Sequence, residues 1–235
     1  MNAFDLDILR WCGQLAAHRP ALVHIFTALN GCVLVKGDLF MAVCFWLWFS
    51  TQEGQEERRE ILVSTLLAAF AAIVVGRELA THLPYRVRPV FNPAVGLPDI
   101  LVAQADALRN WSAFPSDHAV LFSALATGFA FVSLPLGLAA HAYWLLVVAV
   151  PRVFLGLHHP TDVLGGAVVG VVIALIANQR LIRRRAAAVA LSWRSLHPAS
   201  FYACAFLVFA EIGTMFSDVR GVLSSVAVLA GLSHR

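Results

Sequence analysis

The stretch ILVSTLLAAFAAIVVG, residues 61–76, decides the fold class of this chain. It is a continuous apolar run without a charged side chain, and it lacks the alternation of apolar and polar residues that marks a half-buried strand. A membrane helix needs roughly 20 apolar residues to cross roughly 30 Å of hydrocarbon, and only helices or closed barrels satisfy their backbone groups in lipid. Such a run favours a membrane helix over a barrel strand.

The composition of the whole chain supports the same interpretation. Of its 235 residues, 60% are hydrophobic and only 13% are charged, whereas about a quarter of the residues in a soluble domain are charged. The four cysteines are Cys12, Cys32, Cys44 and Cys204. Because they form no C-x-x-C pair and no metal-ligand spacing, they are predicted to be small core residues. The sequence indicates a single integral membrane domain over residues 1–235.

Six hydrophobic stretches are predicted to span the membrane. They cover about residues 30–50, 60–81, 117–135, 138–156, 161–179 and 199–217. We therefore expect an all-α bundle of six spans over residues 30–235. Residues 1–29 are predicted to be an amphipathic interfacial segment whose helix ends near Pro20. The apolar stretch Gly221–Leu232 either extends the last span or forms a separate helix.

Arginines between the spans predict the orientation. The loop after the first span carries Arg58 and Arg59, and RLIRRR (residues 180–185) follows the fifth span, so both loops fall on one side of the membrane. An excess of Arg and Lys in short loops marks the cytoplasmic side. The long loop 82–116 and the short loop 157–160 are then predicted to face the other side.

Three polar segments gather on that other side. They are THLPYRVRPVF (81–91), AFPSDHAV (113–120) and PRVFLGLHHPTD (151–162). Ionisable groups at the ends of spans are costly unless they have partners or a function. A helix that begins at PSDH would present backbone N–H groups and Ser116 to an anion, with His118 in its first turn.

The third segment places ionisable residues at helical spacing. His158 and Asp162 are four residues apart, so on a helix they would share a face, and the carboxylate would fix the imidazole tautomer. Arg152 precedes His158 by just under two helical turns and would point into the same pocket. Arginines, a helix N-terminus and two histidines are the parts of a phosphoryl-transfer site. One histidine would attack phosphorus and the other would protonate the leaving oxygen.

Together the segments resemble the signature of the type 2 phosphatidic acid phosphatase superfamily, which reads K-x6-R-P, then P-S-G-H, then S-R-x5-H-x3-D. Arg88 and Pro89 match the first part, PSDH (115–118) matches the second, and residues 151–162 match the third. The FPSDH and RVRPVF forms resemble the bacterial branch that acts on undecaprenyl diphosphate at the outer face of the plasma membrane.

The resemblance implies a role for each matched residue. It makes His158 the nucleophile that becomes phosphohistidine, Asp162 its orienting partner, and His118 the acid for the leaving group. The residues that it assigns to the phosphate oxygens are Arg88, Arg152 and Ser116. It further implies a reaction that needs no metal or other cofactor, a lipid phosphate or diphosphate as substrate, and no nucleic-acid partner.

Three positions depart from the signature. Thr81 stands where the first part has lysine, Pro151 replaces the serine of the third part, and Asp117 replaces the glycine of P-S-G-H. Arg77, one helical turn before Thr81, and Arg86 are the candidates to replace the missing cation. Thr81 and Asp117 are still expected at the phosphate site, because they keep their positions in the motifs.

Several other polar residues have simpler interpretations. His159 would face away from His158 on a helix and is interpreted as an interfacial residue. Glu211 lies in the last span and is either functional or paired with a polar group of another helix. Lys36 and Asp38 are interpreted as marking the place where the first span enters the membrane at the interface.

Other functions stay open beside a phosphatase. A metal site built from His118, His158 and Asp162 is disfavoured because the neighbouring arginines would repel a cation. Transport or lipid scrambling is disfavoured because the charges gather at one membrane face and no inverted repeat is evident. A third alternative is an inactive relative that binds a lipid phosphate.

The expected reaction is the conversion of undecaprenyl diphosphate to undecaprenyl phosphate for recycling of the carrier lipid. The alternative substrates are phosphatidic acid, phosphatidylglycerol phosphate and lipid A phosphates, since each joins a phosphate to a hydrophobic tail. The resemblance implies a multi-pass protein of the plasma membrane whose site faces the periplasm. The sequence does not predict the oligomeric state.

Overall fold

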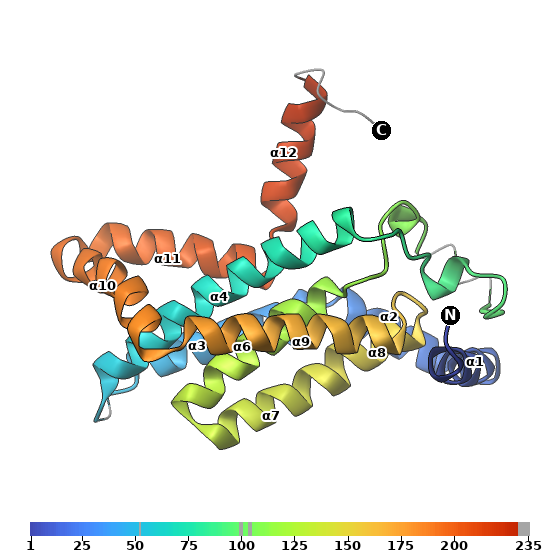
Figure 1. Cartoon of the computed structure of the whole chain (residues 1–235), viewed down its shortest axis with the longest axis horizontal. Helices are drawn as coiled ribbons and strands as arrows, with labels where there is room; N and C mark the ends of the chain where they lie inside the picture. Colours follow the sequence, from blue (N-terminus) through green and yellow to red (C-terminus); the bar gives the residue numbers. More distant parts are fainter. Residues whose placement is uncertain (52, 99–100, 103–104, 230–235) are drawn as a thin grey trace.

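The computed structural model describes residues 1–51, 53–98, 101–102 and 105–229, and these parts of the chain hold helices and no strand (Figure 1). The first half consists of α1 (Ala3–His18), α2 (Pro20–Gly31), the π-helical turn η1 (Leu34–Asp38), α3 (Leu39–Phe49) and the long α4 (Gln55–His82). Two short 3₁₀ turns, η2 (Pro89–Phe91) and η3 (Asp106–Leu108), interrupt the loop that follows α4. The predicted all-α class is confirmed.

The second half forms the remainder of the bundle. Its elements are α6 (Asp117–Val132), α7 (Leu134–Trp144), the π-helical turn η4 (Leu145–Ala149), α8 (Val150–Phe154), α9 (Pro160–Ala177), α10 (Arg180–Leu196), α11 (Pro198–Gly213) and α12 (Ser217–Leu229). The helix α12 projects away from the bundle (Figure 1). The stretch Gly221–Leu232 therefore belongs to a separate helix as far as Leu229, and its last three residues lie outside the described part.

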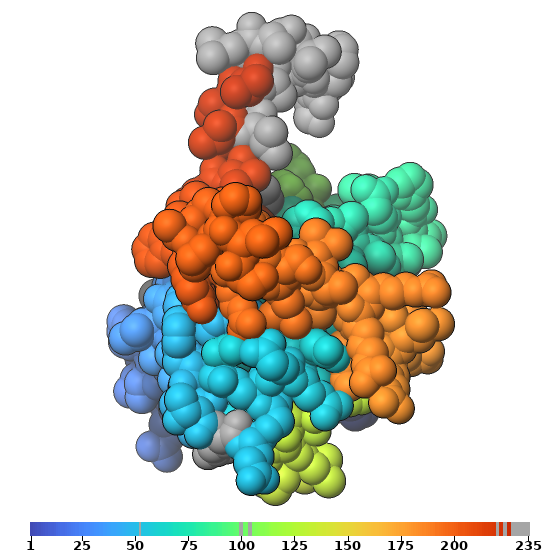
Figure 2. All heavy atoms as spheres, turned by 90° about the vertical axis from the view of Figure 1, so that its left-hand side faces the viewer, coloured from blue at the N-terminus to red at the C-terminus, as the bar shows by residue number. Residues whose placement is uncertain are grey.

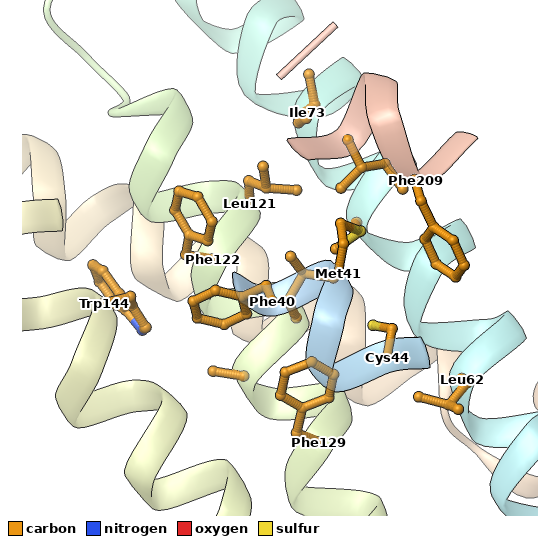
Figure 3. Close-up of a cluster of buried hydrophobic side chains, with 14 of the residues drawn as sticks. Phe40, Met41, Cys44, Leu62, Ile73, Leu121, Phe122, Phe129, Trp144 and Phe209 are labelled. Atoms are coloured by element: carbon orange, nitrogen blue, oxygen red, sulfur yellow. The ribbon is translucent and has the colours of Figure 1, made fainter. Parts of the chain in front are cut away.

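The centre of the bundle is α6, which packs against α4, α7 and α9. Every residue from Ala119 to Phe129 in α6 is buried, as expected for a helix that is apolar on all sides. Phe122 of α6 lies 5.0 Å from Phe40 of α3 between ring centroids, and Trp144 of α7 faces the same cluster (Figure 3). This core fixes the position of the N-terminal turn of α6.

Two small residues bring α9 close to α6. A Cβ atom added at Gly166 would lie 2.7 Å from the Ser116 carbonyl oxygen, and one added at Gly170 would lie 2.1 Å from that of Val120. Small residues four apart let helix backbones approach closely in membrane proteins. The contact aligns the first turns of both helices, and the N–H of Ser116 donates to the Asp162 carbonyl at 3.2 Å.

The predicted spans correspond to helices of unequal length. Among the described residues, three helices are long and apolar enough to cross a membrane, namely Gln55–His82, Leu134–Phe154 and Pro160–Ala177. The pair Pro20–Gly31 and Leu34–Phe49, bent by 64°, would make a fourth span. The other two predicted spans correspond to the shorter apolar helices α6 and α11. A multi-pass protein is supported, while the number six and the interfacial place of residues 1–29 stay predictions.

The two arginine-rich segments lie together at one end of the bundle, as the sequence predicted, although they belong to the beginnings of the helices α4 and α10 and not to loops. Arg183 of α10 forms an ion pair with Glu57 of α4 at 2.7 Å, and Arg194 pairs with Glu56 at 3.2 Å. Figure 2 shows the orange segment that contains α10 against the cyan beginning of α4 at this end, and α11 packs against α10. Since α4 runs the length of the bundle, its last turn lies at the opposite end.

The remaining structural predictions have mixed outcomes. Cys12 and Cys44 are buried, as expected of core residues, whereas Cys204 is exposed, so the prediction was wrong there. An exposed thiol on a helix that faces outward packs against no core. The Glu211 carboxylate accepts a long hydrogen bond of 3.5 Å from the N–H of Val219 in α12, which agrees with the pairing interpretation.

Candidate active site

A cavity of about 1110 Å³ opens at the end of α4 that lies opposite the arginine-rich segments. The three polar segments and the beginning of α12 form its walls. Its ionisable lining includes Arg77, Arg88, Asp117, His118, Arg152 and His158. The structure thus brings together residues that lie up to 81 positions apart in the sequence.

The loop that carries His158 has a defined shape. The helix α8 ends at Phe154, the chain reverses at Gly156 with φ +68°, and α9 begins at Pro160. A positive φ is readily adopted by glycine because it has no Cβ atom. The Gly156 carbonyl accepts from the N–H of Val90 at 3.0 Å, which joins this loop to the segment of Arg88.

His158 is 3% exposed, and both of its ring nitrogens have partners. Its Nδ1 lies 2.8 Å from the carbonyl oxygen of Ala113, which can only accept, so Nδ1 carries the proton. Its Nε2 lies 3.3 Å from Nη1 of Arg88 and 3.3 Å from Nη2 of Arg152. Nε2 therefore keeps a lone pair directed at two guanidinium groups.

Neutral oxygen acceptors hold both arginines. Arg88 donates to the carbonyls of Trp111, Ser112 and Leu157 at 3.2, 3.2 and 2.7 Å. Arg152 donates from Nη1 to the side-chain oxygen of Asn30 at 2.9 Å, and its buried Nε has no hydrogen-bond partner within the described residues. In the described part of the chain, no carboxylate lies at hydrogen-bond distance from either guanidinium, so the pair suits an incoming anion.

The second histidine lies on the other side of Arg152. His118 is in the first turn of α6, and its Nε2 is 3.2 Å from Nη1 of Arg152. Arg152 therefore stands between the imidazoles of His118 and His158, with one nitrogen toward each. An anion bound to this guanidinium would have a histidine on either side.

Burial lowers the pKa values of His158 and Arg88. Desolvation lowers the pKa of His158 well below its ordinary value of 6.5, and the charges of Arg152 and Arg88 lower it further. Desolvation also lowers the pKa of Arg88, and the negative charges of Asp117 and Asp162 raise it by a smaller amount. The imidazole of His158 is consequently neutral near pH 7, the state in which its nitrogen can act as a nucleophile.

Asp162 does not orient His158 through a direct hydrogen bond. Its Oδ2 is 3.9 Å from Nδ1 of His158, and the Ala113 carbonyl takes that bond instead. The expectation assumed one helix from residue 158 to 162, whereas α9 begins only at Pro160. Asp162 is the third residue of α9, and its Oδ2 accepts from the backbone N–H of His159 at 2.7 Å. Asp162 therefore fixes the backbone of the loop and does not hydrogen-bond the imidazole ring of His158.

His159 and Arg86 are buried or half-buried partners of Asp162. His159 caps α9, and its Nδ1 lies 2.9 Å from the Asp162 carboxylate. Arg86 donates to the other oxygen of Asp162 at 2.5 Å and to Asp5 at 2.8 Å. The cavity lining does not include Arg86, so the structure does not bring it to the place of the missing lysine. Two carboxylates engage it instead.

Asp5 of α1 is a residue that the sequence did not indicate. It is fully buried and accepts from Arg86 and from both the N–H and the hydroxyl of Thr161, at 3.0 and 2.6 Å for the latter two. The first helix of the chain is thereby joined to the beginning of α9. An aspartate near the start of an amphipathic helix gives no signal of such a partner.

The remaining predicted residues divide between the cavity and its walls. Thr81 and Asp117 line the cavity, and Asp117 forms a 2.8 Å ion pair with Arg77. Arg77 is therefore the cation nearest in sequence to Thr81 that reaches this space. Ser116 is 1% exposed, caps α6 and is absent from the lining. Ser116 therefore occupies the position that precedes the first turn of α6 and does not itself line the cavity.

Pro151 has a structural explanation. A proline inside a helix removes a backbone donor and clashes with the carbonyl four residues earlier. Here the π-helical turn η4 ends two residues before Pro151, and such a turn widens the backbone spacing. Arg152 can thus follow Pro151 without a break in the helix.

Within the described residues, no group of three or more His, Cys, Asp and Glu side chains is arranged to hold a metal ion. The charged groups that face Nε2 of His158 are the guanidiniums of Arg88 and Arg152, and guanidiniums bind phosphate or carboxylate in a planar, bidentate manner. The arrangement can bind an anion, attack it with a neutral imidazole and supply a proton from a second imidazole.

Comparisons with known proteins give consistent matches. Residues 62–186 match the PAP2 superfamily. YbjG from Escherichia coli (strain K12), named as a candidate undecaprenyl-diphosphatase, is 30% identical over 146 residues, which are 59% of this chain and 63% of that protein. That match thus covers less than two thirds of the length of YbjG.

Two further relatives cover more of the chain. The bacitracin transport permease protein BcrC of Bacillus licheniformis is 26% identical over 183 residues, 74% of this chain and 79% of BcrC. Lipid A 1-diphosphate synthase of Escherichia coli (strain K12) is 30% identical over 183 residues, 73% of each protein. No solved structure gives a significant match.

The buried carboxylate of Asp5 yields a prediction about stability. Asp5→Ala should lower the free energy of unfolding by about 3–5 kcal/mol, because it removes one of the two buried carboxylates that hold Arg86 and the acceptor of the Thr161 N–H and hydroxyl. Asp7→Ala is the matched control, since Asp7 is exposed on the same helix, and it should change stability by less than about 0.5 kcal/mol. Thermal unfolding in detergent measures both; equal melting temperatures for the two variants would contradict the anchoring role.

Proposed function

We propose a reaction for this chain from the family to which it belongs, the PAP2 superfamily of type 2 phosphatidic acid phosphatases. The family match confirms the resemblance expected from the three polar segments, and it supports a lipid phosphatase role. The specific reaction that we propose is removal of the terminal phosphate from undecaprenyl diphosphate, which yields undecaprenyl phosphate. The name of YbjG supports this substrate.

The observation that carries the proposal is the convergence of two arginines on one nitrogen of His158. Arg88 and Arg152 both reach Nε2 at 3.3 Å, while Nδ1 is occupied by the Ala113 carbonyl. A phosphate that replaces Nε2 as the acceptor for the two guanidiniums would lie directly before the lone pair of that nitrogen. His158 is thus positioned for attack on phosphorus, with charge stabilisation already in place.

The proposed reaction has two steps. In the first, Nε2 of His158 bonds to the terminal phosphorus while the bond to the bridging oxygen breaks, and His118 gives a proton to the departing lipid phosphate. In the second, His118 accepts a proton from water, which attacks phosphohistidine and releases inorganic phosphate. Asp162, Arg86 and Asp5 hold the loop of His158, and the first turn of α6 faces the phosphate oxygens.

The location of the site supports a proposal for its side of the membrane. The cavity and the arginine-rich segments lie at opposite ends of α4. By the preference of arginine for cytoplasmic loops, the cavity would open outside the cytoplasm. We therefore place the protein in the plasma membrane with its site on the periplasmic face. There the lipid tail can stay in the bilayer while the headgroup enters the cavity.

The name of BcrC favours transport as a second candidate function. The charged cavity residues do not support it as well, because they lie at one end of the bundle and converge on a nucleophile. A transporter would need no histidine with a free lone pair between two arginines. Phosphate release and its dependence on His158 separate the two functions.

The proposed nucleophile His158 can be tested directly. Its replacement in His158→Ala should reduce phosphate release from undecaprenyl diphosphate by at least about 10⁴-fold, because no nucleophile remains, while the melting temperature stays within a few degrees. EDTA should not inhibit the wild type. His159→Ala serves as the control for the neighbouring position and should retain measurable release. Phosphate release by pure His158→Ala protein at more than a hundredth of the wild-type rate would contradict the assignment of His158 as the nucleophile.

The pH dependence of kcat/KM tests the protonation state of His158. Only neutral His158 can attack, and its pKa is lowered, so kcat/KM should fall only when the pH drops below 6.5. The lipid phosphate itself titrates near pH 6, so the acid limb of the enzyme must be identified as the one shared by two different lipid substrates. Arg152→Gln removes one neighbouring charge and should move that limb to higher pH. A shared limb above pH 6.5 in the wild type would contradict a neutral, buried nucleophile.

A further inference from the structure

Lys36 lines the same cavity as the histidines, although it lies outside the residues that match the family. The sequence interpretation placed it at the end of a span, where lysine commonly meets the interface. In the structure it belongs to the π-helical turn η1, between α2 and α3. Such turns are rare and are found frequently at functional sites.

Contacts on two sides fix the position of η1. The hydroxyl of Tyr143 in α7 donates to the Val35 carbonyl at 2.6 Å. Gly37 packs directly on α11, where an added Cβ atom would lie 1.9 Å from the carbonyl oxygen of Gly213. The turn therefore cannot shift without moving α7 or α11, and the backbone of Lys36 is held beside the cavity.

The side chain of Lys36 lies on the His118 side of the site. Its Nζ donates to the backbone carbonyl of Asn30, and the side-chain oxygen of the same Asn30 accepts from Nη1 of Arg152 at 2.9 Å. That Nη1 is the nitrogen that approaches His118, whereas His158 approaches Nη2. Asn30 thus joins Lys36 to the half of the site that faces the leaving group.

The charge of Lys36 has no ionic partner. Within the described residues no carboxylate forms an ion pair with it, and its hydrogen bond goes to a neutral carbonyl. Arg77, the other cation on this side, is already paired with Asp117 at 2.8 Å. A half-buried ammonium with only a neutral acceptor is well suited to gain an anionic one.

We propose that Lys36 binds the phosphate that stays on the lipid, and thereby selects lipid diphosphates over lipid monophosphates. The inference rests on the proposed function. When the bond between the terminal phosphorus and the bridging oxygen breaks, its electron pair goes to that oxygen, which becomes part of the departing lipid phosphate. A fixed cation on the His118 side stabilises this charge. A lipid monophosphate releases an alcohol instead, which offers no second phosphate to Lys36.

The test compares Lys36→Met with Lys36→Arg on two substrates. For Lys36→Met, kcat/KM on undecaprenyl diphosphate should fall about 10- to 100-fold further than on phosphatidic acid, as expected for the loss of one charged hydrogen bond. Lys36→Arg keeps the cation and should restore most of the difference. Asp38→Asn, on the exposed side of the same turn, is the control for changes in η1. If Lys36→Met does not fold, Lys36→Gln replaces it in the comparison.

A second readout keeps this test independent of the proposed substrate. Inorganic pyrophosphate and inorganic phosphate are used as competitive inhibitors with whichever lipid the wild type hydrolyses. Lys36→Met should weaken inhibition by pyrophosphate at least about tenfold more than inhibition by phosphate. Equal effects on both inhibitors, or none, would overturn the role of Lys36. A wild type that hydrolyses a different lipid diphosphate but not undecaprenyl diphosphate would overturn the proposed substrate alone, whereas hydrolysis of lipid monophosphates only would also overturn the selection by Lys36.

Discussion

The site depends on two like charges that are buried against one imidazole. Arg88 and Arg152 are each less than a tenth exposed, and both direct a nitrogen at Nε2 of His158. Removing a cation from water is expensive, and two adjacent cations repel each other. Backbone carbonyls and the amide of Asn30 offset part of this penalty by hydrogen bonding. The full compensation would come with a bound anion, which explains why the site favours a phosphate group.

A second, electrically balanced cluster holds that first one in place. Arg86 lies between the carboxylates of Asp5 and Asp162, and these in turn bind the backbone at Thr161 and His159. This cluster fixes the beginning of α9 and the loop that carries His158. The two clusters therefore differ in function. The cluster of Arg86, Asp5 and Asp162 positions the loop. The pair of Arg88 and Arg152, whose charges are not balanced by a carboxylate at hydrogen-bond distance in the described residues, is available for the ligand.

Much of this arrangement could be predicted from the sequence, because the motif residues lie at fixed positions in three short segments. Apolar runs predicted the helices, and the motifs predicted that Arg88, His118, Arg152 and His158 lie at one cavity, whose lining leaves out Ser116, Arg86 and Asp162. His158 and Asp162 do approach each other, at 3.9 Å between Nδ1 and Oδ2, but they form no direct hydrogen bond, because α9 begins two residues after His158 and the helical spacing does not extend through the loop. The number of spans is equally hard to read, since α6 is apolar but only 16 residues long.

The contacts that the first 36 residues make with distant segments could not be predicted. Asp5, Asn30 and Lys36 come from the first 36 residues, and no local pattern shows which loop each will meet. Lys36 in particular is indistinguishable in sequence from an interfacial lysine, because the π-helical turn that directs it to the cavity depends on Tyr143 and Gly213. Such contacts are properties of the packed bundle. They appear only when α2, α7 and α11 are assembled around α6.

The most direct test of the account is to look for the covalent intermediate. Wild-type protein in detergent would be mixed with undecaprenyl diphosphate labelled in its terminal phosphate, quenched within one turnover in alkali, digested and mapped. The account predicts an alkali-stable, acid-labile phosphate on His158, absent from His158→Ala. Label on His118 instead, or release of phosphate with no labelled histidine in rapidly quenched samples, would contradict His158 as the nucleophile.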